Sequence, residues 1–208
     1  RDVLGSRGLG DVYKRQKYDS MKILAILAAL FLSIGYGYAQ TYEKFVEKSF
    51  DFLDKNDLVS AEESLRAAMR LEPGNPNNYA LLMNLGTIQR RQGKLEDALL
   101  SYTAALSRHP NNEAILENRA GLYTEMGEIE KATNDYNALL ILNPHHQEAL
   151  YCRAMLHLQH KNYLLAEQDF DKILEVNEKS VKGRLGHAIL EKLRGNYDES
   201  ERIFNYLI

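Results

Sequence analysis

Apolar residues recur along most of this chain with the period of an α-helix. Residues 113–126 carry a broad apolar face at helical spacing: Ala114, Ile115, Leu116, Ala120, Leu122, Tyr123 and Met126. A second segment from Ile129 to Leu142 has the same character. Gly127 separates the two, because glycine readily takes the left-handed conformation that ends many helices. Pro144 stops the second segment, since it has no N–H to donate. The pattern predicts a helix–turn–helix unit over residues 113–146.

The same unit recurs along the chain. The stretch GKLEDALLSYTAALSRHP at 93–110 matches GEIEKATNDYNALLILNP at 127–144 in its Gly, Ala, Tyr and Pro positions. A small residue marks each copy with spacings of 37, 34, 34 and 34: Ala61, Ala98, Ala132, Ala166 and Ser200. The turn slot lies five residues before each marker: Asn56, Gly93, Gly127, Lys161 and Gly195. A fixed period of this length predicts stacked helix pairs that cannot bury their apolar surface alone.

This pattern resembles the tetratricopeptide repeat, with small residues at positions 8 and 20, an aromatic at 11 or 24, Gly at 15 and Pro at 32. The Trp favoured at position 4 is absent, and other residues stand there: Phe45, Leu82, Leu116, Leu150 and Arg184. The resemblance implies an all-α, right-handed α-solenoid over residues 40–208. Its copies are 42–75, 79–112, 113–146, 147–180 and 181–208, the last truncated. The insertion Pro76-Asn77-Asn78 is expected to bend or loosen the junction between the first two copies.

The first forty residues have a different character. Residues 21–39 combine Lys22, an apolar run from Ile23 to Ile34 and the small-residue site Gly37-Tyr38-Ala39, which is typical of a secretory signal cleaved before Gln40. The apolar run is shorter than the ~20 residues that a membrane anchor needs. Residues 1–20 include SRGLGDVYKRQ, which resembles translated adaptor sequence, and we interpret them as a non-native extension. We therefore expect an exported, periplasmic or extracellular bacterial protein with no membrane span after cleavage.

Composition narrows the class of partner. The 208 residues are 45% apolar and 26% charged, as in a folded globular protein. The formal net charge of -3 gives no basic footprint, so nucleic acid is not expected as a partner. The single cysteine, Cys152, cannot form an internal disulfide.

Histidines and the cysteine are the residues that could suggest chemistry. His157 and His160 stand three apart in HLQH, and His145-His146 follow Pro144, but zinc needs a third and usually a fourth ligand. Cys152 occupies the slot of Asn84 and Asn118 in the preceding copies, which favours packing over a nucleophile. Nucleophile-elbow and phosphate-loop motifs are absent from the sequence. The sequence thus predicts no enzyme, no cofactor, no metal site and no catalytic residue.

The resemblance implies a concave groove, lined by the first helices, that receives an extended peptide or a helix. The family's groove positions fall on Met83, Asn84, Arg90, Arg91, Glu117, Asn118, Tyr151, Met155, Leu158, Leu185 and Ile189. Along this groove we expect a basic second copy through Arg90 and Arg91 and an acidic third copy through Glu117 and Glu125. The fourth and fifth copies are expected to be apolar.

Within this groove, Tyr151 and Met155 are predicted to hold a partner's apolar anchor, because aromatic and Met side chains concentrate interface energy. The amides of Asn84 and Asn118 can bond a ligand's backbone. An alternative is that Leu185 and Ile189 pack against a C-terminal continuation. Some family members clamp a C-terminal carboxylate with basic residues. Here the corresponding residues include Met83, Glu148 and Cys152, which disfavours that ligand.

These observations together predict a non-catalytic scaffold or adaptor that binds a protein or peptide partner outside the cytoplasm. The alternative is a sensor or targeting arm of a longer protein, such as an enzyme or kinase, that continues beyond Ile208. The sequence does not identify the partner or the oligomeric state.

Overall fold

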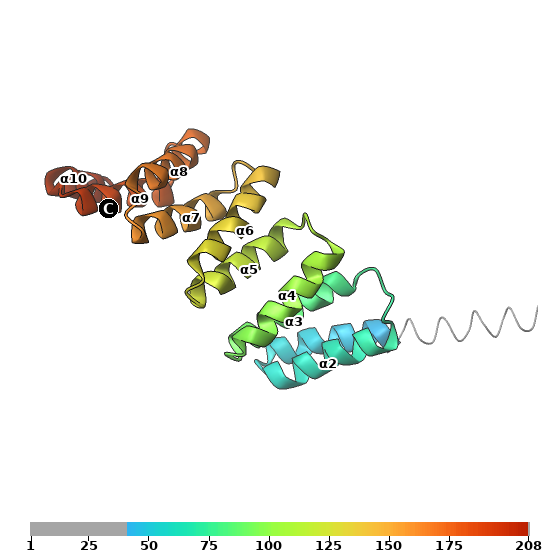
Figure 1. Cartoon of the computed structure of the whole chain (residues 1–208). Coiled ribbons are helices and arrows are strands. Elements are labelled where there is room, and N and C mark those ends of the chain that lie inside the picture. The colour runs from blue at the N-terminus through green and yellow to red at the C-terminus, as the bar shows by residue number, and fades with distance from the viewer. Residues whose placement is uncertain (1–40, 208) are drawn as a thin grey trace, which may run out of the picture. The chain divides into compact units, whose positions relative to one another are not determined.

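The computed structural model describes residues 41–207, which Figure 1 draws in colour. These residues divide into two compact units. The boundary falls between Asn75 and Pro76, where the sequence carries its three-residue insertion. The predicted signal segment and the extension before it lie outside the described residues. No helix in the range 41–207 is long and apolar enough to cross a bilayer.

The first unit contains one helix pair. It is helical over residues 41–54 and again in α2, Leu58–Leu71. Asp57 starts α2, because its carboxylate accepts a hydrogen bond from the backbone N–H of Ser60. The buried apolar side chains of this unit are Tyr42, Ala61, Leu65 and Ala68.

The second unit contains four helix pairs in the described chain. Their bounds are α3 Asn78–Arg91, α4 Leu95–Arg108, α5 Glu113–Glu125, α6 Ile129–Leu142, α7 Gln147–Gln159, α8 Tyr163–Val176, α9 Val181–Arg194 and α10 Tyr197–Leu207. Each first helix packs on its own second helix, and each second helix packs on the next first helix. Figure 1 shows these pairs following one another from α3 to α10. The predicted all-α solenoid of helix–turn–helix repeats is confirmed.

The turn inside each repeat uses one backbone conformation. Gly93, Gly127 and Gly195 have φ of 76°, 75° and 89°, and the equivalent Asn56 and Lys161 have φ of 58° and 60°. The predicted left-handed role of Gly127 is therefore confirmed. The turn slot imposes this conformation even where the residue carries a Cβ, at a cost that glycine avoids.

The first helices α5, α7 and α9 begin at side-chain caps that recur every 34 residues. Asn112, His146 and Ser180 each accept a hydrogen bond from the backbone N–H three residues later. Such a bond satisfies one of the N–H groups that a helix start leaves without a partner. His146, a candidate for metal chemistry in the sequence, is therefore an N-cap residue.

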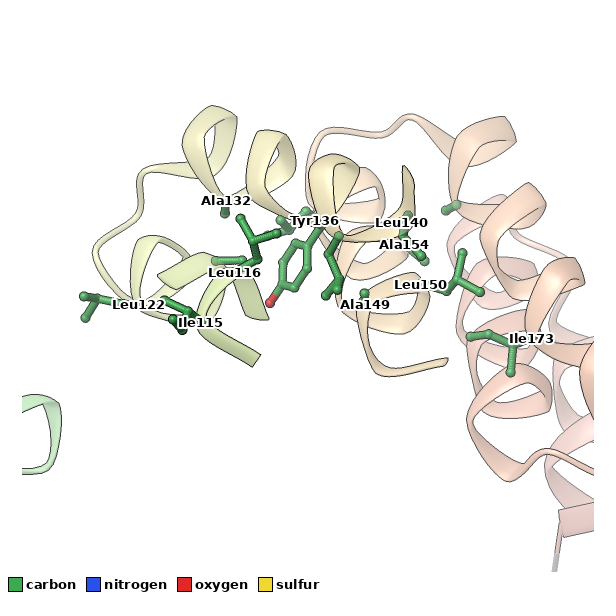
Figure 2. Close-up of a cluster of buried hydrophobic side chains, with 14 of the residues drawn as sticks. Ile115, Leu116, Leu122, Ala132, Tyr136, Leu140, Ala149, Leu150, Ala154 and Ile173 are labelled. Carbon is green, nitrogen blue, oxygen red and sulfur yellow. The ribbon is translucent and has the colours of Figure 1, made fainter. Parts of the chain in front are cut away.

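The core lies between the helices of each pair and between neighbouring pairs. The marker residues Ala98, Ala132 and Ala166 are fully buried, and four residues later Tyr102, Tyr136 and Phe170 are 0%, 3% and 0% exposed. Figure 2 shows Tyr136 projecting among Leu116, Ala132 and other buried side chains of this cluster. Burying one such large side chain contributes about 1.5–3 kcal/mol.

Small residues make room for these rings. A Cβ at Gly86 would lie 2.7 Å from the Tyr102 ring, and one at Gly186 would overlap the Phe170 ring. Gly86 is position 8 of the second copy, where the repeat pattern has a small residue.

Candidate functional site

The predicted groove residues all lie on the first helices of the second unit. Met83, Asn84, Arg90 and Arg91 are on α3, Glu117 and Asn118 on α5, Tyr151, Met155 and Leu158 on α7, and Leu185 and Ile189 on α9. Contacts of α3 with α5 and of α7 with α9 place neighbouring first helices side by side. We call the layer of α3, α5, α7 and α9 the first-helix layer.

Ion pairs connect adjacent helices of this layer. Arg90 Nε donates to Glu125 Oε2 at 2.6 Å, and an Arg90 terminal nitrogen lies 3.5 Å from the Gly121 carbonyl oxygen. The Lys182 ammonium pairs with the Glu148 carboxylate. The predicted separation into a basic second copy and an acidic third copy is therefore wrong for Arg90 and Glu125, because these two charges neutralise each other across the repeat boundary.

The apolar part of the layer is half-buried. Tyr151, Met155 and Ile189 pack against the core cluster while keeping part of their surface exposed. The Tyr151 ring lies 6.1 Å from the Phe170 ring, measured between centroids, and Lys182 Nζ lies 5.7 Å from the Tyr151 centroid. Leu185 is also half-buried. These side chains can offer apolar contact without rearranging the core.

Leu158 does not share this exposure. Only 6% of its surface is exposed, and it belongs to the core cluster. The sequence-based placement of Leu158 on the groove surface is corrected, because at this position the helix turns the side chain toward its own core.

The polar residues predicted to line the groove differ in whether their hydrogen-bonding groups already have partners. The Asn118 side-chain amide donates to the Ala114 carbonyl oxygen at 2.8 Å, so its nitrogen already serves the helix. Asn84 is half-buried and makes no side-chain hydrogen bond to any residue in the range 41–207. Met83 packs partly against the core, Arg91 is exposed, and Glu117 Oε2 lies 3.9 Å from His146 Nε2.

Half-buried Cys152 on α7 lies beside buried Tyr136 on α6. Burial raises the pKa of the Cys152 thiol, and a hydrogen bond with Tyr136 opposes this only in part. Burial also raises the pKa of Tyr136 well above its usual range. A thiol with a raised pKa stays protonated at neutral pH and is a poor nucleophile. The environment of Cys152 therefore favours a packing role.

Two largely buried ion pairs that join a first helix to its second helix were not anticipated from the sequence. The Arg119 guanidinium donates two hydrogen bonds to the Asp135 carboxylate at 2.7 and 2.8 Å, and Arg153 does the same to Asp169 at 2.8 and 2.6 Å. Arg153 also donates to Asn137 on the preceding second helix. The repeat period could have indicated these pairs, because the two arginines are 34 residues apart and so are the two aspartates.

The comparisons with known proteins decide the family. The tetratricopeptide repeat model matches residues 51–113 and 118–180, which is more than half of the chain. The chain belongs to the tetratricopeptide repeat family.

Solved structures agree with this assignment. A tetratricopeptide repeat protein from Parabacteroides merdae ATCC 43184 has 77% sequence identity and a TM-score of 0.79, over 81% of this chain and 66% of its own. MamA protein has 15% identity and a TM-score of 0.71, over 81% of this chain and 91% of its own. The first TPR of Spaghetti (RPAP3), bound to the HSP90 peptide SRMEEVD, has 22% identity and a TM-score of 0.52, over 59% of this chain and 94% of its own. The last two show likeness of fold alone. Among curated proteins, none matches.

Membership defines the class of function. A tetratricopeptide repeat domain is a protein–protein interaction scaffold that binds protein or peptide partners, and proteins of this family are generally non-catalytic. This chain spans 66% of the Parabacteroides merdae protein.

Its repeat position also accounts for His157. His157 holds position 11 of its tetratricopeptide repeat, where Tyr123 stands one copy earlier, and burial lowers its pKa. His157 and His160 line a hollow of about 550 Å³ with Glu130 and Asn134 of α6. Within residues 41–207, no three His, Cys, Asp or Glu side chains are grouped to hold a metal ion.

Proposed function

We propose that this tetratricopeptide repeat protein is a non-catalytic scaffold or adaptor that binds a peptide or helix on its first-helix layer, outside the cytoplasm. The observation that carries the proposal is the row of half-buried apolar side chains on adjacent first helices, namely Tyr151, Met155, Leu185 and Ile189. Partly exposed aromatic and Met side chains backed by a rigid core are typical interface anchors.

Tyr151 and Met155 form the anchor point of the proposed interface. The Tyr151 ring packs against the Phe170 ring at a tilt of 52°, and the Lys182 ammonium lies over its face. A partner's apolar side chain would displace the Lys182 ammonium from over the ring, while the Lys182–Glu148 pair keeps this ammonium close by. Leu158 is excluded from this surface by its burial.

Backbone recognition is assigned to the asparagines. Asn84 offers both its donor and its acceptor, whereas Asn118 offers mainly its oxygen, since its nitrogen bonds Ala114. A partner with a C-terminal carboxylate clamped in the manner known in this family is not expected, because Met83, Glu148 and Cys152 stand where basic residues would be needed. The proposed ligand is therefore an internal segment of a protein.

The groove proposal is tested with a partner obtained by affinity pull-down with the exported protein. Its affinity for Tyr151→Ala is then compared with its affinity for Lys131→Ala, an exposed substitution on a second helix. We expect Tyr151→Ala to weaken binding by at least about 1 kcal/mol, as for an interface anchor, and Lys131→Ala to leave it unchanged. Equal losses, or no loss in either variant, would refute the assignment of the groove.

Export is proposed from the signal pattern at 21–39. A chain initiated at Met21 in a bacterial host should yield a mature protein that begins at Gln40, which N-terminal sequencing of the secreted or periplasmic fraction would reveal. An intact Met21 in the membrane fraction would contradict this proposal.

A second candidate is a sensor or targeting arm of a longer protein. It is favoured by the Parabacteroides merdae protein, which is 77% identical over the matched region but of which the chain covers only 66%. Reading the genomic locus past Ile208 distinguishes the two. An enzyme or kinase domain in the same reading frame supports the arm, and a stop codon soon after a final helix supports the free adaptor.

A further inference from the structure

Two hollows lie one repeat apart in the second unit, each lined by two consecutive second helices and the first helix between them. The first has a volume of about 330 Å³ and is lined by α6, α7 and α8. The second has a volume of about 430 Å³ and is lined by α8, α9 and α10, through Leu174, Arg184, His187, Arg202, Ile203 and Tyr206. Four lining residues of the first hollow return 34 positions later in the second, as Leu140/Leu174, Leu150/Arg184, Arg153/His187 and Lys172/Tyr206.

The substitutions between the two copies change the chemistry of the second hollow, which we call the α9 hollow. In the first hollow Arg153 is held by Asp169 and Asn137. One repeat later, His187 stands in place of Arg153, Ile203 in place of Asp169 and Asp171 in place of Asn137. His187 Nε2 reaches Asp171 at 3.0 Å, and Ile203 contributes an apolar surface in place of a carboxylate. The α9 hollow therefore lacks the buried Arg–Asp pair of its predecessors.

A cation without a carboxylate partner lies at this hollow. Arg184 replaces the leucine of the preceding copy, and its guanidinium carbon is 4.2 Å from the centroid of the Tyr206 ring. Its Nε donates to the Glu178 backbone oxygen at 3.0 Å, and Arg184 forms no ion pair with any residue in the range 41–207. Arginine has five N–H donors, so this group keeps most of its bonding capacity beside an apolar wall.

We propose that the α9 hollow binds a small amphipathic carboxylate. The apolar part of the ligand would lie against Leu174 and Ile203, and its carboxylate would take the bidentate geometry that a guanidinium favours on Arg184. A volume of about 430 Å³ falls in the range of about 300–1,000 Å³ typical of small-molecule sites. Stacking on Tyr206 holds the Arg184 plane in place for this contact.

The position of this hollow within the repeat keeps it accessible. The equivalent hollow one repeat earlier remains open although α9 and α10 follow it in the chain. A site of this kind is thus compatible with further stacking, and its lining residues do not include the proposed groove residues of α9, Leu185 and Ile189. The α9 hollow would add a ligand-binding function to the scaffold.

The test uses the full chain and three probes with ten-carbon chains: decanoate and decyltrimethylammonium below their micelle concentrations, and 1-decanol below its solubility limit. Binding is followed by isothermal titration calorimetry and by amide chemical shifts. We expect decanoate to bind at least about tenfold more tightly than 1-decanol, a difference of about 1.4 kcal/mol. The cationic probe should bind most weakly, and shifts should concentrate in α8, α9 and α10.

Two variants make the result specific. Arg184→Gln should reduce decanoate affinity to the level of 1-decanol without changing 1-decanol binding. Lys172→Gln, a cation at the equivalent hollow one repeat earlier, should leave decanoate affinity unchanged. The proposal is overturned if decanoate fails to bind, if it binds no better than 1-decanol, or if both variants lower its affinity equally.

Discussion

At the scale of single residues, the turn inside each repeat depends on one left-handed backbone position. Glycine occupies it at Gly93, Gly127 and Gly195, whereas Lys161 holds a φ of 60° with a full side chain. A residue with a Cβ pays about 1–2 kcal/mol in this conformation. The fourth repeat therefore carries a local strain that the third does not.

Substitutions at this turn position should change the free energy of unfolding in opposite directions in the fourth and third repeats. Lys161→Gly relieves about 1–2 kcal/mol of strain and costs about 0.5–1 kcal/mol in chain entropy, so the free energy of unfolding should rise by about 0.5–1 kcal/mol. Gly127→Ala should lower it by about 1 kcal/mol. Urea denaturation measures both, and Lys161→Ala is the control that removes the side chain but keeps the strain. A loss of stability in Lys161→Gly would contradict this account.

His157 should make stability depend on pH. Burial lowers its pKa, nearby Arg153 and His160 lower it further, and Asp169 opposes them. The unfolded chain then binds the proton more readily than the native protein, so stability is full above the ordinary pKa of 6.5 and falls as the pH drops through the native pKa.

The free energy of unfolding of the parent should therefore decrease between pH 7.5 and pH 5, and His157→Gln should flatten this decrease. A hydrogen bond from Arg194 holds the pKa of Glu167 below its usual 4.5. The effect of Glu167 on stability therefore appears at lower pH than that of His157. A parent and a variant with identical profiles above pH 5 would exclude His157 as the cause.

At the scale of helices, the pairs are joined by polar contacts as well as by apolar packing. Arg119–Asp135 and Arg153–Asp169 each connect a first helix to its second helix, and Arg153 extends the connection to the preceding repeat. Asp169 is 3% exposed at its side chain, and Arg153 is 16% exposed. Such a pair orients the helices but becomes costly if one partner is lost.

Asp169→Ala should accordingly lower the free energy of unfolding by about 3 kcal/mol, since it leaves a largely buried guanidinium without its carboxylate. The double variant Arg153→Met/Asp169→Leu should recover most of this loss. As a matched control, Glu128→Ala breaks an exposed pair with Lys131 and should cost less than about 1 kcal/mol. If the double variant were as unstable as Asp169→Ala, the loss would not come from the unpaired charge.

At the scale of the whole molecule, each repeat of the second unit contacts only its neighbours, so a defect should remain local. Gly186 tests this, because Phe170 of the preceding repeat fills the space of its absent Cβ. Glycine to alanine normally stabilises a helix by about 0.5–1 kcal/mol, whereas overpacking costs about 1–3 kcal/mol.

Gly186→Ala should reduce amide hydrogen-exchange protection in α8, α9 and α10 and leave α3 to α6 unchanged. Adding Phe170→Leu should restore part of the protection. Gly74→Ala, where a Cβ meets no atom within 4 Å, is the control. A uniform loss of protection across the second unit would indicate a single cooperative block instead.

The sequence alone determined the helices, their turns and the family. The 34-residue period, the marker alanines and Gly127 are local features of the sequence. They act through side-chain size and allowed φ, so they can be recognised without knowing the tertiary contacts. The same positions placed the predicted groove residues on α3, α5, α7 and α9. The export signal at 21–39 stays a prediction.

Only the tertiary structure decided how these side chains are used. Leu158 is in the core, Arg90 and Glu125 neutralise each other, and Arg184 stands beside an apolar hollow without a carboxylate. Each outcome depends on which residue of a neighbouring repeat comes within a few ångströms. The period specifies that repeats stack, but the contacts across the junction arise from side-chain lengths and directions that a position number does not contain.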